Sequence, residues 1–404
     1  MKQDEQWLIA VTAGHWQMHG IREAKLAGLK VIAIDADPAA EGFSISDLSI
    51  LGSLDDFDII IKKLKKLSLN FCGAVSFCSE AGMKLAARIR EEFLLPGPDM
   101  TLTLALLDKG IQRKIWTDYN VPGPQWKVFN DFSEAIKILP EFPLPFIIKP
   151  TDSSGSRGVT KIESLDSTIF EEAIKKAFRF SKSGKIIIES FMDGIEFTIE
   201  VFVINSVVNV LAVTEKKKVE GTKGTVASEL ATTDRPAKIV EEIKNAVIEA
   251  FKALNYTDGP GHAEIILKKD GSVGLVEVAG RGGGFMVFNG LVPVVSNINI
   301  AQLTALQAVG KQVEISNLSS NAAVLRFFPS KPGKLISISG LDIANQIPGV
   351  VCASFVEVGS CFQKAEADGD RLGYILSYAS TLTAAKQLAN NAEKLIHFEI
   401  KSMS

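Results

Sequence analysis

One hairpin-like stretch, residues 261–278, constrains the fold of this chain more than any other part of the sequence. Asp270-Gly271 is the strongest kind of short turn signal, and it stands between two strand-like runs. If these two residues form the loop, counting back along both strands brings Glu264 directly opposite Glu277. Facing residues on antiparallel strands have Cβ atoms roughly 4.5–5.5 Å apart, and like charges there are destabilising. The spacing therefore predicts a cation between the two carboxylates.

Carboxylate oxygens suit Mg²⁺, which usually keeps water and substrate phosphates among its ligands. The alternative interpretation is an exposed acidic pair on a solvated face of the hairpin. The rest of the chain has to decide between the two.

Length and composition limit the class of protein. At roughly 150 residues per domain, 404 residues indicate two or three domains. The chain is 46% hydrophobic and 23% charged, as expected of a soluble globular protein. Its formal net charge of −3 gives no electrostatic reason to expect nucleic acid or an anionic membrane as a partner.

The four cysteines show no metal-type spacing, which indicates reduced thiols and a cytoplasmic location. The first apolar stretch, Trp7 to Ala13, is too short for a signal sequence with its flanks. No apolar run approaches the roughly 20 residues needed to cross a bilayer. We therefore expect no contact with a membrane.

Residues 1–100 alternate between strand-like and helix-like patterns. This rhythm predicts a parallel sheet with helices on both faces, in the α/β class. The segment after the first strand, residues 14–20, lacks the glycine fingerprint of a dinucleotide site. The strand ends around Gly14 and Ser79-Glu80 could still line a small-molecule pocket. The expected strands are 7–13, 31–34 and 73–77, and the expected helices are 18–28, 55–69 and 80–93.

The middle and end of the chain mix strands and helices. Two strands are expected to pair across Asn205-Ser206, and about 94 residues after position 310 indicate a small α+β domain. The expected strands are 126–129, 146–150, 185–188, 196–203, 207–213, 321–328, 353–358 and 373–378, and the expected helices are 168–180, 236–254, 299–309 and 382–394.

A loop of small polar residues, 152–158, follows a strand that ends in Lys149-Pro150. Successive backbone N–H groups in such a loop can form an anion-binding concavity, and three serines add hydroxyl donors. Lys149 would add a compact cation for phosphate. The loop is not a P-loop, because Gly-Lys-Ser/Thr is missing. The alternative is a flexible surface turn.

Two further segments suggest a nucleotide and an anionic substrate. Residues 189–196 could hold an adenine against apolar side chains and a ribose against Glu196, or they could be an ordinary turn. Arg281 stands in a glycine cluster just beyond Glu277, where arginine can bind carboxylate or phosphate bidentately. Lys216 either lies on a solvated edge or points at phosphate.

The order of these parts is more informative than any one of them. Asp108-Lys109, Lys149, the glycine-serine loop, Glu189 to Glu196, Glu264 with Glu277, and Arg281 follow each other along the chain. In this order residues 101–310 resemble the ATP-grasp superfamily. The resemblance implies a three-domain architecture: an N-terminal parallel α/β domain (1–100), an ATP-grasp α+β domain (101–310) and a small C-terminal α+β domain (311–404).

The resemblance also implies roles for individual residues. Those expected to bind ATP are Lys109, Lys149, Ser153, Ser154, Gly155, Ser156, Gly158, Glu189, Phe191, Met192 and Glu196. Glu264 and Glu277 are expected to hold Mg²⁺, for which Mn²⁺ could substitute. Ala279 stands where many superfamily members carry Asn, so a second Mg²⁺ would be held less firmly.

Three short motifs look most like the L-amino acid ligase branch: His-x-Glu at 262–264, Glu-x-x-x-Arg at 277–281 and Asp234-Arg235-Pro236. They imply an ADP-forming carboxylate–amine ligase that works through an acylphosphate, on small-molecule carboxylate and amine substrates that resemble amino acids. Arg281 would bind the carboxylate or acylphosphate, and His262 would orient the substrate or the tetrahedral intermediate. Helices of the N-terminal domain could pair into a homodimer.

Other functions stay open at this stage. Within the superfamily they are a purine-biosynthesis enzyme that acts on a ribonucleotide and a biotin carboxylase-like enzyme. Outside it they are a non-catalytic ATP-binding module and an oxidoreductase that uses the N-terminal domain. The intact set of lysines and acids argues against loss of catalysis, and the missing dinucleotide fingerprint argues against the oxidoreductase.

Overall fold

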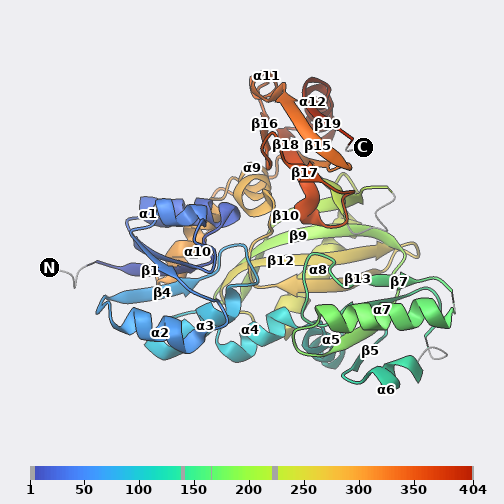
Figure 1. Ribbon diagram of the computed structural model, residues 1–404, viewed down its shortest axis with the longest axis horizontal. Helices are drawn as coiled ribbons and strands as arrows, with labels where there is room; N and C mark the ends of the chain where they lie inside the picture. The colour runs from blue at the N-terminus through green and yellow to red at the C-terminus, as the bar shows by residue number, and fades with distance from the viewer. Residues whose placement is uncertain (1–4, 138–141, 165, 221–225, 403–404) are drawn as a thin grey trace.

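The computed structural model describes residues 5–137, 142–164, 166–220 and 226–402. A parallel sheet with its helices forms the N-terminal region, a small and a large sheet form the middle region, and the C-terminal region stands on the large sheet (Figure 1). The predicted mixed α/β architecture is confirmed. Within the described ranges no helix combines the length and apolarity needed to cross a membrane.

The N-terminal region contains a four-stranded sheet in the order β3-β2-β1-β4, in which neighbouring strands are parallel. Its strands are apolar and buried because helices cover both faces. The elements are β1 (Trp7–Val11), η1 (His15–Gln17), α1 (Met18–Leu26), β2 (Lys30–Asp35), η2 (Glu41–Ser44), β3 (Leu48–Leu51), α2 (Phe57–Lys65), β4 (Phe71–Val75) and α3 (Met83–Phe93).

Helices from two distant parts of the sequence cover this sheet. On one face Ile60 of α2 and Ile89 of α3 pack with Ile9 and Ile32. On the other face α1 lies against α10 (Ile300–Ala308), which comes some two hundred residues after the sheet ends. The core of the N-terminal region is thus completed by a helix that the sequence places at the end of the middle region.

The small sheet of the middle region is antiparallel, in the order β5-β8-β6-β7. Phe170 and Ile174 of α7 pack on its apolar face against Ile148 and Ile188. The elements of this part are α4 (Met100–Leu107), α5 (Lys109–Asp118), β5 (Trp126–Phe129), α6 (Phe132–Lys137), β6 (Phe146–Pro150), β7 (Thr160–Ile162), α7 (Ser167–Phe180) and β8 (Ile186–Ser190).

The large sheet has eight strands in the order β13-β12-β9-β10-β11-β14-β18-β16. The long helix α8 covers its first strands, with Val247 and Phe251 packed against Val201 and Ile265. The elements from the middle region are β9 (Gly194–Ile204), β10 (Val207–Lys218), β11 (Ala227–Thr232), α8 (Ala237–Ala253), β12 (Gly259–Lys268), β13 (Val273–Ala279), η4 (Val287–Leu291) and α9 (Val292–Ser296).

The predicted hairpin exists, but its turn was predicted wrongly by one residue. Lys268 donates its backbone N–H to the Ser272 carbonyl at 2.8 Å, so three residues form the loop rather than Asp270-Gly271 alone. Glu264 nevertheless faces Glu277, because a bulge beside Glu264 shifts the register back by one. Two compensating irregularities therefore preserve the pair on which the metal prediction rests.

The strands of the C-terminal region are divided between two sheets. Three of its strands, β14, β16 and β18, extend the large sheet of the middle region, and only β17, β15 and β19 form a separate sheet. The strand expected at 353–358 lies earlier, at β16. The elements are β14 (Ala322–Pro329), β15 (Gly333–Ser339), α11 (Leu341–Ala344), β16 (Val350–Ser354), β17 (Cys361–Phe362), η5 (Asp368–Asp370), β18 (Arg371–Ala379), α12 (Leu382–Leu395) and β19 (His397–Lys401).

Candidate active site

A buried charge triad links α5 to the small sheet. Lys149, near the end of β6, lies 2.7 Å from one carboxylate oxygen of Glu189 on β8, and Arg113 of α5 lies 2.8 Å from the other. All three side chains are almost fully buried. Burial works against the charge of Glu189, but Arg113 and Lys149 outweigh it and hold its pKa below the usual value. Burial lowers the pKa of Lys149, and Glu189 opposes this shift. The ion pair fixes both predicted residues in place.

The predicted phosphate lysine Lys109 bridges two other predicted elements. Its Nζ lies 2.6 Å from Glu277 on β13 and donates to the Ser153 carbonyl at 2.9 Å. Asp108 caps α5 through the Ile111 N–H at 3.0 Å, which fixes where the lysine leaves the helix. Burial lowers the pKa of Lys109, but Glu277 and other nearby carboxylates raise it by more. The net pKa lies above the usual value, so the lysine stays charged.

The second predicted metal carboxylate, Glu264, is also held by a lysine. Lys216 Nζ lies 2.7 Å from Glu264 and 2.7 Å from Glu196, and Lys218 lies 2.5 Å from Glu196. Of the two interpretations of Lys216, the structure supports the one that directs it into the site. Burial opposes the charge of Glu264, but Lys216 outweighs it and the pKa is held well below the usual value.

The carboxylates of Glu264 and Glu277 fit a Mg²⁺ ion by their chemistry. They are two oxygen donors in register on neighbouring strands, each side chain about 19% exposed. Within the described residues no group of three or more acidic, histidine or cysteine side chains gathers that could bind a metal alone. Any Mg²⁺ here would need further oxygen ligands from phosphate and water, as this ion usually has.

The loop 152–158 has the backbone of an anion site. Gly155 and Ser156 have φ values of 63° and 59°, so successive residues are left-handed and their N–H groups can converge. Asp152 anchors the loop base by accepting the Ser183 N–H at 2.6 Å. Across the described ranges no protein group occupies the hydroxyls of Ser153 and Ser156. They remain available to a ligand.

The predicted adenine residues lie on the connection between β8 and β9. The Phe191 N–H donates to the Pro145 carbonyl at 3.1 Å, and Lys161 Nζ lies 4.2 Å from the centre of its ring. Met192 packs against Gly274 on β13, where a Cβ would lie only 2.4 Å from its sulfur. The predicted residues at 189–196 thus flank the lysines and carboxylates, in the order expected.

Arg281 joins the site to the N-terminal region. Its guanidinium lies 2.6 Å from Glu80, which follows the strand end flagged in the sequence as a possible pocket wall. The neighbouring Gly282 N–H donates to the Phe77 carbonyl at 3.1 Å. Burial works against the charge of Glu80, but Arg281 and Lys109 outweigh it and lower its pKa. An anionic substrate at Arg281 would therefore lie where the N-terminal and middle regions contact each other.

His262 is paired with a residue that the sequence analysis missed. Its Nδ1 lies 2.5 Å from Glu200 on β9, and its Nε2 lies 3.9 Å from Glu264. Glu200 also accepts the Gly283 N–H at 3.0 Å. Burial lowers the pKa of His262, but the Glu200 carboxylate outweighs it and raises the pKa to about 9. The imidazole is therefore a cation at neutral pH.

The sequence did not predict Arg113 or Glu200 as residues of this site. It also did not predict Glu80 as the partner of Arg281. A signal for Glu200 was present, because Glu196 and Glu200 alternate with apolar residues and so share one face of a strand. Arg113 and Glu80 come from helix and loop segments far from their partners. No local pattern marks those contacts.

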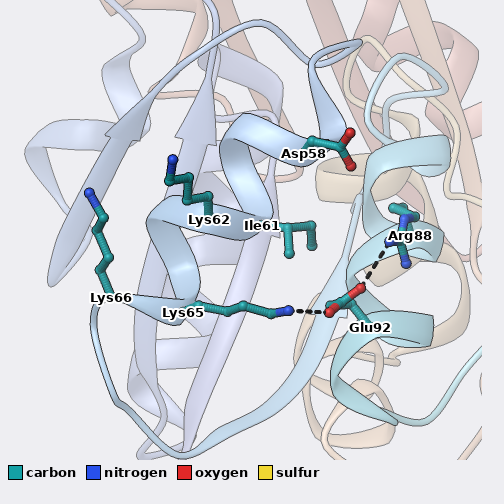
Figure 2. A pocket seen from close by; sticks show the side chains of 7 residues that line it. All are labelled: Asp58, Ile61, Lys62, Lys65, Lys66, Arg88 and Glu92. Carbon is teal, nitrogen blue, oxygen red and sulfur yellow. Dashed lines mark ion pairs between the residues drawn. The ribbon is translucent and has the colours of Figure 1, made fainter.

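A hollow of about 460 Å³ lies between α2 and α3, away from the candidate active site. Lys65 and Arg88 lie 2.5 and 2.9 Å from the carboxylate of Glu92, and dashed lines mark both ion pairs in Figure 2. Lys62 and Lys66 stand beside them and point away from it (Figure 2). None of the residues predicted for ATP, metal or substrate lines this hollow.

Two family models match the chain. A model described as an ATP-grasp domain matches residues 142–289, and one described as L-amino acid ligase C-terminal domain 2 matches residues 326–401. Residues 142–289 are therefore similar to an ATP-grasp domain. Residues 326–401 are similar to the C-terminal domain of L-amino acid ligases.

Whole-chain similarity extends over the same architecture. The structure of L-amino acid ligase from Bacillus licheniformis superposes with a TM-score of 0.85 at 22% identity, covering 100% of both chains. An uncharacterized protein of Sinorhizobium fredii is 25% identical over 97% of this chain and 82% of its own length. Phosphoribosylamine–glycine ligase of Listeria innocua is 24% identical over 63% of this chain, and the match spans 64% of that enzyme.

Proposed function

We propose that this protein is an ADP-forming carboxylate–amine ligase that joins amino-acid-like substrates through an acylphosphate. One observation carries the proposal: Glu264 and Glu277 face each other and are paired with Lys216 and Lys109. Arg281, paired with Glu80, lies near enough for the charge of Glu277 to act on it. Phosphoryl transfer needs positioning and charge neutralisation more than covalent help from the protein. The proposed site supplies these through fixed cations and carboxylates.

The residues would divide the work as follows. Glu264 and Glu277 would hold Mg²⁺, which neutralises phosphate charge when bound. Lys109, Lys149 and the N–H groups of loop 152–158 would bind the phosphates of ATP. Arg281, aligned by Glu80, would bind the carboxylate that is activated.

The chemistry balances in two displacements. A carboxylate oxygen attacks the γ-phosphorus, the bond to the bridging oxygen breaks, and ADP leaves with an acylphosphate remaining. The amine nitrogen then attacks the acyl carbon, phosphate leaves with its oxygen, and the amine gives up one proton. His262, kept as a cation by Glu200, would stabilise the negative oxygen of the tetrahedral intermediate.

The C-terminal match to L-amino acid ligase supports amino acids as the substrate class. The similarity to phosphoribosylamine–glycine ligase supports a second candidate, ligation of an amino acid to a ribosylamine phosphate. Both candidates activate a carboxylate with ATP, so they differ only in the amine.

The test is release of phosphate from ATP and Mg²⁺ across a matrix of single and paired amino acids, with products identified by mass. We expect ADP, phosphate and a condensed product to appear together for particular pairs. Release that requires 5-phosphoribosylamine would support the second candidate instead. No stimulation by any amino acid, alone or with 5-phosphoribosylamine, would contradict the proposal.

A further inference from the structure

A cavity of about 940 Å³ lies between the N-terminal and middle regions, apart from the residues assigned to ATP and substrate. Its wall combines α3, the linker that begins at Pro96, the start of α4, the loop at 254–260 and the end of α10. Figure 1 shows α3 and α4 side by side at this junction. The cavity is thus enclosed by segments that the sequence keeps far apart.

Arg90 lines this cavity without an ion pair in the described residues, and Glu91 and Asp99 act on its charge only from a longer distance. The residue is 8% exposed. Its Nε donates to the Pro98 carbonyl at 2.8 Å and its Nη1 to the Ala74 carbonyl at 2.9 Å. In the ranges that the structure describes, Nη2 has no hydrogen-bond partner and no carboxylate lies within ion-pair distance. Unpaired buried charge is costly, so the site favours an anion.

Two acids, Asp99 and Asp258, also line the cavity. Asp99 accepts the Leu102 N–H of α4 at 2.7 Å, and Asp258 accepts from Gln307 at 2.8 Å. Both carboxylates therefore have hydrogen-bond partners, whereas Nη2 of Arg90 has none in the described residues.

We propose that this cavity binds a small carboxylate with an apolar body. Its carboxylate would pair with the Arg90 guanidinium, whose Nη2 has no hydrogen-bond partner in the described residues. Met83, Ala86 and Leu254 give the apolar part of the ligand a surface to pack on. A cavity of this size is in the range of small-molecule sites.

The cavity also touches the segments that hold Arg281. Gly280, the residue before it, lines the cavity, and so does Ser76, next to Phe77. The Phe77 carbonyl in turn accepts the N–H of the residue after Arg281. A ligand here would lie near the segment that carries Arg281, although Arg281 does not itself line the cavity. The site stands on its own geometry, whichever reaction the protein catalyses.

The test is calorimetric titration of the full-length protein with 3-phenylpropionate. Its uncharged analogue, 3-phenylpropionamide, serves as the control ligand. We expect the carboxylate to bind and the amide to bind at least about tenfold more weakly, because only the carboxylate forms charge-assisted hydrogen bonds. Arg90→Met should weaken the carboxylate about tenfold or more. Arg88→Met removes a half-buried arginine that pairs with Glu92 on the same helix. It and Arg281→Met should leave the affinity for the carboxylate within about twofold.

Equal binding of acid and amide, loss of binding in Arg281→Met instead of Arg90→Met, or no binding would overturn the proposal. If Arg90→Met does not fold, Ala308→Trp blocks the cavity from a half-buried position and should abolish binding. A crystal soaked with 3-(4-bromophenyl)propionate should show anomalous bromine signal between α3 and α10. Signal only near Arg281 would contradict the site.

Discussion

At the residue scale, Glu277 shows how a carboxylate that faces another carboxylate is stabilised by a lysine. It faces another glutamate in register, yet each carboxylate has its own lysine within 2.7 Å. The site thus keeps two acids and two bases in a nearly balanced set. An incoming Mg²⁺ and phosphate bring charges of both signs, and these could exchange with the existing pairs.

Glu277→Gln should lower turnover by about 10²-fold or more, because one of two metal carboxylates is lost. Its effect on stability should stay within about 1 kcal/mol, since the lost pairing to Lys109 is partly exposed and repulsion with Glu264 is relieved. Steady-state phosphate release and thermal unfolding would check both. A variant that keeps the wild-type rate would show that the metal assignment is wrong.

Gly283→Ala should destabilise the protein by about 1–3 kcal/mol, because the new Cβ would lie 2.7 Å from Glu200 Oε1 and 2.6 Å from Val287 Cγ1. It should also reduce turnover by displacing the partner of His262. Gly284→Ala is the matched control, since a Cβ there meets no atom within 4 Å. Equal unfolding midpoints for the two variants would contradict this packing.

At the scale of elements, hairpins are where local sequence decides the outcome. Asn205 and Ser206 have φ values of 49° and 66°, the left-handed pair of a two-residue turn, and this hairpin was predicted correctly. The Asp270-Gly271 turn was predicted one residue short. Its loop length depends on the Lys269 N–H bond to Asp193, a contact with another strand end that local pattern does not contain.

Ser206→Gly should therefore stabilise the protein by about 0.5–1 kcal/mol, because glycine adopts the left-handed conformation without strain. Gly271→Ala should destabilise it by a similar amount, since its φ is +86°. Denaturant unfolding of the two variants measures both signs. Stabilisation by Gly271→Ala would show that the loop is not held in this conformation.

Much of the candidate site could be predicted from the chain because its motifs are local. Lys149 lies near the end of β6, and loop 152–158 follows this strand. Glu264 and Glu277 lie on one hairpin. The partners that complete the site come from elsewhere. Whether Arg113 meets Glu189 or Glu80 meets Arg281 depends on how separate sheets and helices pack, which residue spacing does not encode.

At the scale of the whole molecule, the three regions are interlocked. α10 packs on the N-terminal sheet, and β14, β16 and β18 extend the large sheet of the middle region. Sequence patterns predicted these segments as a helix and strands. They do not predict which sheet an edge strand joins or which sheet a helix covers. The domain divisions at residues 100 and 310 stay predictions, and α10 and the strands β14, β16 and β18 pack against elements on the other side of one of them.

A fragment that ends at residue 100 should accordingly fail to fold cooperatively. Without α10 it would expose Leu8 and Ala33, which are fully buried in the intact chain. Circular dichroism during heating, compared with the full-length protein, tests this. A sharp unfolding transition of the monomeric fragment would contradict the shared core.

The most direct test of the central claim is to follow oxygen from the carboxylate substrate. An amino acid substrate carrying ¹⁸O in its carboxylate is incubated with ATP, Mg²⁺ and the amine identified by the matrix, and the released phosphate is analysed by mass. The account predicts one ¹⁸O atom per phosphate, because the acylphosphate passes its bridging carboxylate oxygen to phosphate. Phosphate without ¹⁸O would contradict it.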